Sequence, residues 1–288
     1  MSRHLIRSAC SLVIGLTLVR MFILYHDYLH QTIFKDSIVA GSLLKFYGHL
    51  MLTPPTIWRR THDHHRHNSK IFGASIGSFP VMTTSGYLGA SRAERLEYRM
   101  ARSVWIIVFG YFTVFLFGMC LNPLLNDARR NLQVVGTLVL HFGAFLLSFI
   151  CMGASFTLFA CAIPTYIAML SGAYLFYIQH NFPQAQVRSA QDWTYSDAAL
   201  TASSFLKTGL VMRWFTGNIG FHHVHHLNAK IPFYRLPEAM NGLVGLQSPG
   251  CTSLSIADIF SCLRLKLWDT DLHKFVSFSG VNAILRRA

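Results

Sequence analysis

Histidines gather in three short clusters of this sequence, and their number and spacing indicate the chemistry. Ten of the fifteen histidines lie in HDYLH, HDHHRH and HHVHH, which begin at His26, His62 and His222. Imidazole nitrogens bind iron, copper and zinc. A structural zinc site needs only about four ligands, so a set this large predicts a site for two metals. We expect iron, because redox-active iron can activate O₂ beside apolar segments that deliver unreactive C–H bonds.

The first cluster directly follows an apolar stretch. His26 and His30 are four residues apart, so both imidazoles lie on one side of a helix and can bind one metal or a pair. Asp27 can orient a ligating imidazole by accepting its second N–H. Polar residues at a helix end would show the same spacing, so this cluster alone leaves a structural role open.

The second cluster holds more histidines than regular helical geometry can direct to one site. His62 and His65 are three residues apart, as are His64 and His67, whereas His62 and His64 point to opposite sides of a helix. A basic segment that binds lipid phosphate is the alternative, but that role does not require four histidines. We predict that His62, His64 and His65 bind metal, with His67 as a reserve ligand.

The third cluster has the most specific spacing. His222, His225 and His226 form an HxxHH pattern that places three imidazoles on one face of a helical turn, with His223 as the spacer. His180 follows the last apolar stretch and is a further candidate ligand. No catalytic or cofactor-binding residue is assigned beyond the metal ligands. The predicted ligands are His26, His30, His62, His64, His65, His180, His222, His225 and His226.

Composition indicates that membrane helices position these clusters. The 288 residues are 52% hydrophobic and only 13% charged, which is too apolar for a typical soluble enzyme. Lys and Arg number 25 against 12 Asp and Glu, an excess typical of cytoplasmic loops that face anionic headgroups. We therefore expect no nucleic-acid partner. The six cysteines form no CxxC pair and are predicted to be reduced thiols.

The apolar pattern predicts an all-α integral membrane protein with a single domain over 1–288. A mostly helical cytoplasmic cap should hold the metal site, and the small residues at 151–155 should separate two helices of a hairpin. The expected membrane helices cover about 8–25, 134–151 and 156–178, the expected surface or re-entrant segments cover 37–57 and 103–126, and the expected cap covers 188–288.

The shared site constrains the topology of this multi-pass protein. Three clusters can meet only if all of them reach one face of the bilayer, so the 103–126 segment should not cross. Arginines on both of its sides, including Arg102 and Arg129, indicate the cytoplasmic face. The same rule places Arg3 and Arg7 on the wrong side of the first helix, which an additional helix upstream would correct.

The three clusters, in this order around a membrane hairpin, resemble the integral-membrane fatty acid desaturases, and the bacterial acyl-lipid type in particular. HDYLH with Phe34 resembles the first box of the family, HDxxHxxxF, and Trp58-Arg59 resembles the lead-in to its second box. The family's second box is HxxHH, whereas this sequence has HxHH. Further similar segments are FYIQH at 176–180, Trp193, Ser203-Ser204 and GNIGFHHVHHLNAKIPFYRLPEAM, so the likeness covers nearly the whole chain.

The resemblance implies two iron ions, O₂ as oxidant, and two electrons from a donor of the ferredoxin or cytochrome b5 type. It implies a membrane lipid or an acyl thioester as substrate and a cis double bond as product. The ligands at matching positions are His26, His30, His62, His65, His180, His222, His225 and His226.

Two other functions fit parts of the pattern. A hydroxylase or ketolase acting on carotenoids, sterols or alkanes would use the same boxes, because these specify O₂ activation and not its outcome. A haem-binding membrane cytochrome would instead need single histidines that oppose each other on facing helices within the bilayer. The sequence does not specify the double-bond position, the acyl carrier or the electron donor.

Overall fold

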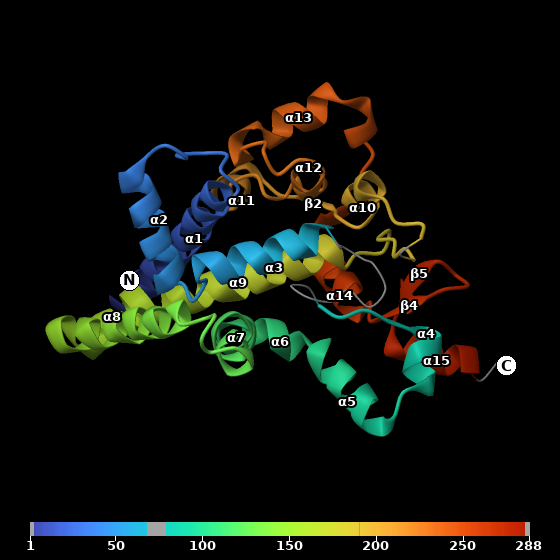
Figure 1. Cartoon of the computed structure of the whole chain (residues 1–288), viewed down its shortest axis with the longest axis horizontal. Coiled ribbons are helices and arrows are strands. Elements are labelled where there is room, and N and C mark those ends of the chain that lie inside the picture. The colour runs from blue at the N-terminus through green and yellow to red at the C-terminus, as the bar shows by residue number, and fades with distance from the viewer. Residues whose placement is uncertain (1–2, 68–78, 190, 286–288) are drawn as a thin grey trace. The chain divides into compact units, whose positions relative to one another are not determined.

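The computed structural model describes residues 3–67, 79–189 and 191–285 (Figure 1). Helices dominate this part of the chain, as the all-α prediction requires, although it also contains five short strands. The chain divides into two compact units. The first unit comprises Met1–Arg60, Ile107–Tyr174 and Val211–Gly217, and the second comprises Thr61–Ile106, Leu175–Leu210 and Asn218–Ala288.

The first unit is built from long apolar helices. Its elements are α1 (Arg3–Leu29), α2 (Ile38–Leu50), the beginning of α3 (Pro55–His67), the π-helix η1 (Tyr111–Leu121), α7 (Asn122–Asn126), α8 (Gln133–Phe156), the π-helix η2 (Thr157–Ala162), the beginning of α9 (Ile163–His180) and most of α11 (Leu210–Phe215). Helix α1 contacts α2 and η2, and α2 also contacts α8.

Small residues on α1 allow its close contact with η2 and α9. The hydroxyl of Ser11 donates to the carbonyl of Phe159, 2.5 Å away. A Cβ added at Gly15 would lie 2.8 Å from the side chain of Ile167, so only glycine fits there without rearrangement. Such contacts between small residues are typical of helices that pack in membranes.

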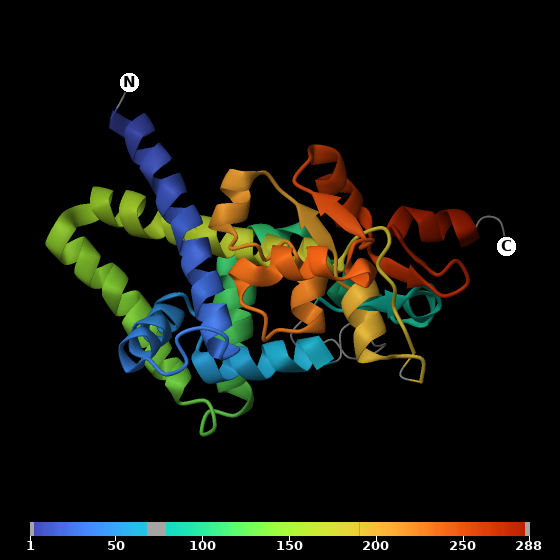
Figure 2. The same cartoon turned by 90° about the horizontal axis from the view of Figure 1, so that it is seen from above.

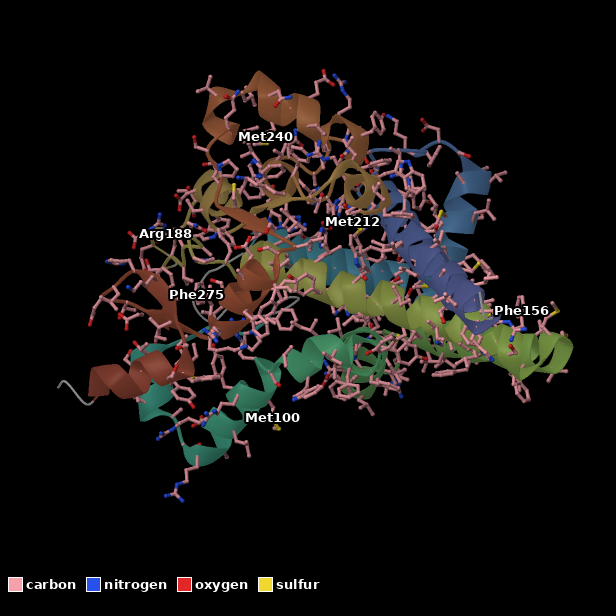
Figure 3. The ribbon with its side chains drawn as sticks, turned by 180° about the vertical axis from the view of Figure 1, so that it is seen from behind. Met100, Phe156, Arg188, Met212, Met240 and Phe275 are labelled. Carbon is pink, nitrogen blue, oxygen red and sulfur yellow. The ribbon has the colours of Figure 1, made fainter. Side chains whose placement is uncertain are left out.

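Two described stretches are long and apolar enough to cross a membrane by length and composition, namely His4–Leu29 and Gln133–His180. The second stretch reverses at Gly153, whose φ of 79° and ψ of 171° interrupt the helix within the expected 151–155 break (Figure 2). Phe156 ends α8 beside this turn (Figure 3). The outer side of α8 exposes Val139 and Ile150 by 68% and 69%, as a lipid-facing helix would.

The second unit combines short helices with short strands. Its helices are α4 (Thr84–Gly89), α5 (Arg92–Ala101), α6 (Val104–Val108, shared with the first unit), α10 (Tyr195–Thr201), α12 (His222–Leu227), η3 (Phe233–Arg235), α13 (Leu236–Gly242), η4 (Val244–Leu246), α14 (Ile256–Arg264) and α15 (Phe278–Leu285). Its strands are β1 (Met82–Thr83), β2 (Phe205–Lys207), β3 (Cys251–Ser253), β4 (Leu267–Asp269) and β5 (Lys274–Val276).

The strands form two small sheets. The first has the order β1-β4-β5, with Met82 parallel to Leu267 and Trp268 antiparallel to Phe275. The second pairs β2 with β3 in parallel, with Leu206 opposite Thr252. The sequence did not predict these strands, because runs of two or three residues are too short to show alternating hydrophobicity.

Candidate metal centre

The first histidine cluster ends helix α1, in the first unit. The rings of His26 and His30 have centroids 4.6 Å apart, as their spacing of one helical turn predicts. His26 is buried, and its Nδ1 lies 2.9 Å from Oδ1 of Asp27, which is also buried. A carboxylate can only accept there, so Nδ1 carries the proton and Nε2 presents its lone pair.

An indole ring covers these two imidazoles within the first unit. The ring centroid of Trp58, on α3, lies 5.2 Å from that of His26 and 5.9 Å from that of His30. Tyr25 packs against the same indole at 6.0 Å and donates its hydroxyl proton to the carbonyl of Thr53 at 2.6 Å. The indole is only 8% exposed, so it restricts the access of water to the histidine pair.

His180 is the central histidine of the second unit. Its Nδ1 lies 2.9 Å from the carbonyl oxygen of Ala202, and a carbonyl only accepts, so Nδ1 carries the proton. Its Nε2 lies 2.9 Å from Nε2 of His65 and also 2.9 Å from Nε2 of His222. Nitrogen atoms from α3, α9 and α12 therefore converge on one point.

His226 extends this group. One ligand atom each from His65, His180 and His226 lies within 4.8 Å of the others, and all three residues are buried. Burial lowers the pKa of His226 well below its ordinary value, and the neighbouring imidazoles, of which His222 has the largest effect, lower it further. Among the described residues, the buried Nε2 of His226 has no hydrogen-bond partner. Neutral imidazoles with converging nitrogens are the state in which histidine binds metal.

The second box contributes two histidines to neighbouring positions in the second unit. The ring of His62 lies 5.9 Å from that of His225, and 6.3 Å from that of His65. His64 belongs to neither of the histidine groups that could hold a metal ion among the described residues. The side chain of His67 lies outside the described part of the structure.

Close backbone packing holds the third box in place. The carbonyl of Gly220 accepts from the amide of Leu206 at 2.8 Å, and a Cβ at Gly220 would lie 2.6 Å from the Leu206 carbonyl oxygen. The hydroxyl of Tyr195 donates to the carbonyl of His226 at 2.5 Å. His223 points away to the carbonyl of Leu246, 3.1 Å from its Nε2, and burial lowers the pKa of His223. Helix α12 thus directs His222 toward His180 and His223 toward Leu246.

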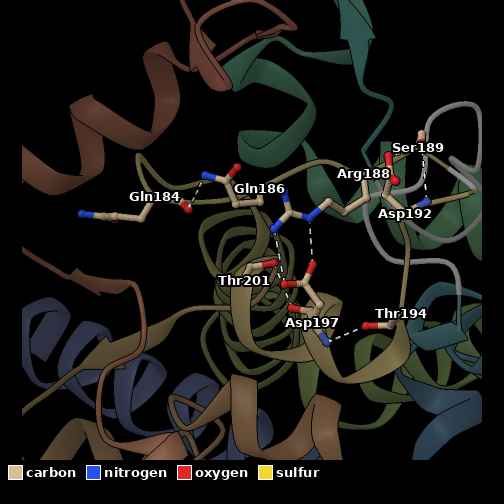
Figure 4. A network of polar contacts seen from close by, with 8 residues as sticks. All are labelled: Gln184, Gln186, Arg188, Ser189, Asp192, Thr194, Asp197 and Thr201. Carbon is tan, nitrogen blue, oxygen red and sulfur yellow. Dashed lines mark hydrogen bonds and ion pairs between the residues drawn. The ribbon is translucent and has the colours of Figure 1, made fainter.

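A polar network fixes the helix that supplies the acceptor for His180 (Figure 4). Arg188 donates to both carboxylate oxygens of Asp197, at 2.8 and 3.3 Å. Thr194 caps α10 by accepting from the amide of Asp197, and Thr201 donates to the carbonyl of Asp197. Because Ala202 is the C-cap of α10, this network determines where its carbonyl meets the imidazole of His180.

The residue after His180 has a supporting role that the sequence analysis missed. The Asn181 amide accepts from Arg102 at 2.6 Å and donates to the carbonyl of Cys262 at 2.6 Å. Arg102 is 1% exposed and donates to the carbonyl of Leu265 at 2.9 Å. Among the described residues it has no carboxylate partner. Burial and the charge of Arg102 lower the pKa of the neighbouring Lys266 to about 8.

The site residues fit a metal of intermediate softness. All the converging ligand atoms are imidazole nitrogens, and the Nδ1 atoms of His26 and His180 are each held by an oxygen acceptor. Such an acceptor fixes the ring orientation and raises the basicity of the ligating nitrogen. A set of nitrogen ligands without thiolates suits iron, copper or zinc.

Comparisons with known proteins agree on one family. The fatty acid desaturase family profile matches residues 4–247. A fatty acid desaturase of Bacillus subtilis (strain 168) is 32% identical over 287 residues, which cover 98% of this chain and 80% of that protein. The sn-1 oleoyl-lipid 12-desaturase of Synechocystis is 23% identical over 80% of this chain and 66% of that protein. The chloroplastic omega-6 fatty acid desaturase of Spinacia oleracea is 21% identical over 80% of this chain and 51% of that protein.

Proposed function

The chain belongs to the fatty acid desaturase family, and we propose that it introduces a cis double bond into an acyl chain of a membrane lipid. O₂ would be the oxidant, and a donor of the ferredoxin or cytochrome b5 type would provide two electrons. The observation that carries the proposal is the convergence of nitrogen atoms from His65, His180 and His226. The Synechocystis relative, whose name specifies an oleoyl lipid, supports a lipid-linked substrate.

The proposed ligands come from all three boxes and from the end of α9. They are His26, His30, His62, His65, His180, His222, His225 and His226. Two iron ions bound there would supply the activation of O₂ and the removal of hydrogen from two adjacent methylenes. His64, the remaining candidate of the second box, stays a prediction that mutagenesis can decide.

The protein's own groups would prepare the ligands for this role. Asp27 and the Ala202 carbonyl hold the Nδ1 protons of His26 and His180, so that both rings direct Nε2 toward a metal. Burial keeps the His226 imidazole neutral, and the Trp58 indole limits water at the first box. These groups would orient the ligands and exclude water.

We further propose a multi-pass membrane topology with the histidines on the cytoplasmic side. Desaturases of this family are membrane-associated, and His4–Leu29 and Gln133–His180 are long and apolar enough to cross. The Gly153 turn would then lie at the far side, and the 103–126 segment would not cross the bilayer. Labelling of single cysteines introduced at Gly153 and at Arg129, in a chain whose six native cysteines are replaced by serine, from each side of sealed vesicles tests this arrangement.

Expression in a desaturase-deficient host tests the function. We expect new acyl chains that lack two hydrogen atoms. Mass spectrometry after chemical derivatisation would give the position of the double bond. A chain with a His226→Ala substitution is the matched control and should give no product. Products that gain an oxygen atom would instead identify a hydroxylase or ketolase, and a haem Soret band in the purified protein would contradict both enzymes.

A further inference from the structure

A buried turn with an unusual backbone conformation connects α2 to α3 in the first unit. Leu52 has a φ of 53° and is fully buried. For a bulky residue other than glycine, this left-handed conformation is strained and persists only where the surroundings enforce it. The amides of Leu52 and Thr53 donate back to the carbonyls of His49 and Gly48 in α2, whereas Pro54 and Pro55, which follow, have no N–H. The carbonyls of the turn therefore depend on donors from outside it.

Side chains from other helices provide these contacts by donating to the carbonyls of the turn. Nδ1 of His141 lies 2.6 Å from the carbonyl of Leu50, and the hydroxyl of Tyr25 donates to the carbonyl of Thr53 at 2.6 Å. The Cys120 thiol approaches the carbonyl of Leu52 at 3.5 Å. Donors from α1, α8 and η1 thus surround one turn. They satisfy buried carbonyls that accept no hydrogen bond within a helix.

His141 is held in a single tautomer. The Leu50 carbonyl can only accept, so Nδ1 of His141 donates, and Nε2 must accept the proton of the Tyr111 hydroxyl at 2.8 Å. His141 is 1% exposed and lies within the apolar stretch Gln133–His180. A polar side chain in such surroundings is costly, and within a membrane it usually serves function.

The turn adjoins the first histidine box and begins the helix that leads to the second. Tyr25, whose hydroxyl donates to the Thr53 carbonyl of the turn, immediately precedes His26 in the sequence. Trp58 lies in the first turn of α3, and its indole contacts the rings of His26 and His30. The same helix continues to His62 and His65, so a shift of the turn would move the start of the helix that carries the second box.

We propose that His141, held by Tyr111, is a positioning residue for the metal ligands. It fixes the Leu50 carbonyl and thereby the turn from which α3 begins, although its own ring does not belong to the metal-ligating groups. This inference rests on the proposed function, because it assumes that the boxes bind iron.

Two amide substitutions separate the roles of the ring nitrogens. In His141→Asn, the amide nitrogen can replace Nδ1 and still donate to the Leu50 carbonyl, whereas the longer Gln replaces Nε2 and leaves that carbonyl without its donor. We expect His141→Gln to weaken iron binding up to about tenfold, the low end of the loss for a direct partner of a ligand, because His141 acts through the turn, and His141→Asn to restore most of it. The control is His49→Gln, because His49 also bridges α2 and α8 through Thr137.

The measurements are iron per purified chain, the EPR spectrum of the nitric oxide adduct of the reduced protein, and thermal unfolding. Equal iron affinity and identical spectra in wild type, His141→Asn and His141→Gln would overturn the inference. If His141→Gln does not fold, Tyr111→Phe decides, since it removes only the hydroxyl and should still alter the spectrum and weaken iron binding. An unchanged Tyr111→Phe protein would then refute the proposal. A wild-type chain that binds no iron would contradict the proposed function itself.

Discussion

The Nε2 atoms of His65 and His180 lie 2.9 Å apart although 115 residues separate them along the chain. Two nitrogens at this distance either share one proton or present lone pairs to a common cation. Because Nδ1 of His180 already donates to Ala202, its Nε2 has no proton in the neutral ring. With both rings neutral, this lone pair can accept a proton from Nε2 of His65, or the two nitrogens can present lone pairs to a common cation.

Substitution of His180 should reduce metal binding without unfolding the protein. In His180→Ala, we expect iron to fall from about two per chain to about one or fewer, because one position of the nitrogen cluster is lost. Desaturation should become undetectable. Atomic absorption of the purified chain measures the change. His4→Ala, at an exposed position of α1, is the control, and an unchanged iron content in His180→Ala would refute the ligand assignment.

The second box allows a direct comparison between neighbouring histidines. His62→Ala should weaken iron binding by at least about tenfold, because its ring lies beside that of His225. His64→Ala should retain iron and activity, because His64 is outside both groups that could hold a metal ion in the described part of the chain. Iron titration of the two variants gives the answer. The opposite ranking would show that the second box uses His64.

Arg102 should contribute to stability through its buried hydrogen bonds. Arg102→Met would leave the buried amide oxygen of Asn181 without its donor and remove one of the donors to the Leu265 carbonyl, which should lower the free energy of unfolding by roughly 2–4 kcal/mol. Arg99→Met in the last turn of α5, which Arg102 follows, removes an exposed cation near the Phe278 ring and should cost less than about 1 kcal/mol. Denaturant titration in detergent compares them. Equal losses would contradict the role of Arg102.

The lowered pKa of Lys266 predicts that the protein becomes more stable at alkaline pH. Its pKa in the folded protein is about 8, below the ordinary 10.5, so folding disfavours its protonated form. The unfolded chain therefore binds more protons between these values, and stability should increase as pH rises from about 8 toward about 10. Relative to Lys266→Met, the gain should be roughly 1 kcal/mol after solvent screening. Thermal unfolding at both pH values measures it, with exposed Lys274→Met as the control, which should follow the wild type.

The sequence predicted the family and the long helices better than the supporting contacts. The family resemblance, confirmed by the comparisons, rested on spacing that a single helical turn displays, such as the four residues between His26 and His30. The apolar runs predicted the long helices because their length and composition are local properties. The position of Gly153 followed from the same local reasoning, since small residues break a helix.

Contacts between distant segments were not predictable in this way. The parallel pairing of β1 with β4 joins residues far apart in the chain, and neither strand is long enough to show a pattern. Asn181 and Arg102 were missed because an amide and an arginine have no spacing signature until the fold brings them together. The contacts of His141 were not predictable for the same reason, since its partners Leu50 and Tyr111 come from other helices.

The support around Asn181 has a consequence for the exchange of segments between relatives. The family profile ends at residue 247, yet the Cys262 and Leu265 carbonyls accept hydrogen bonds from Asn181 and Arg102. A chimaera that joins residues 1–247 of one desaturase to the following segment of another would therefore combine donors from one protein with acceptors from the other. We expect a chimaera joined at the profile boundary to be inactive. Exchange of Arg102, Asn181 and the loop after α14 as one set should restore its activity.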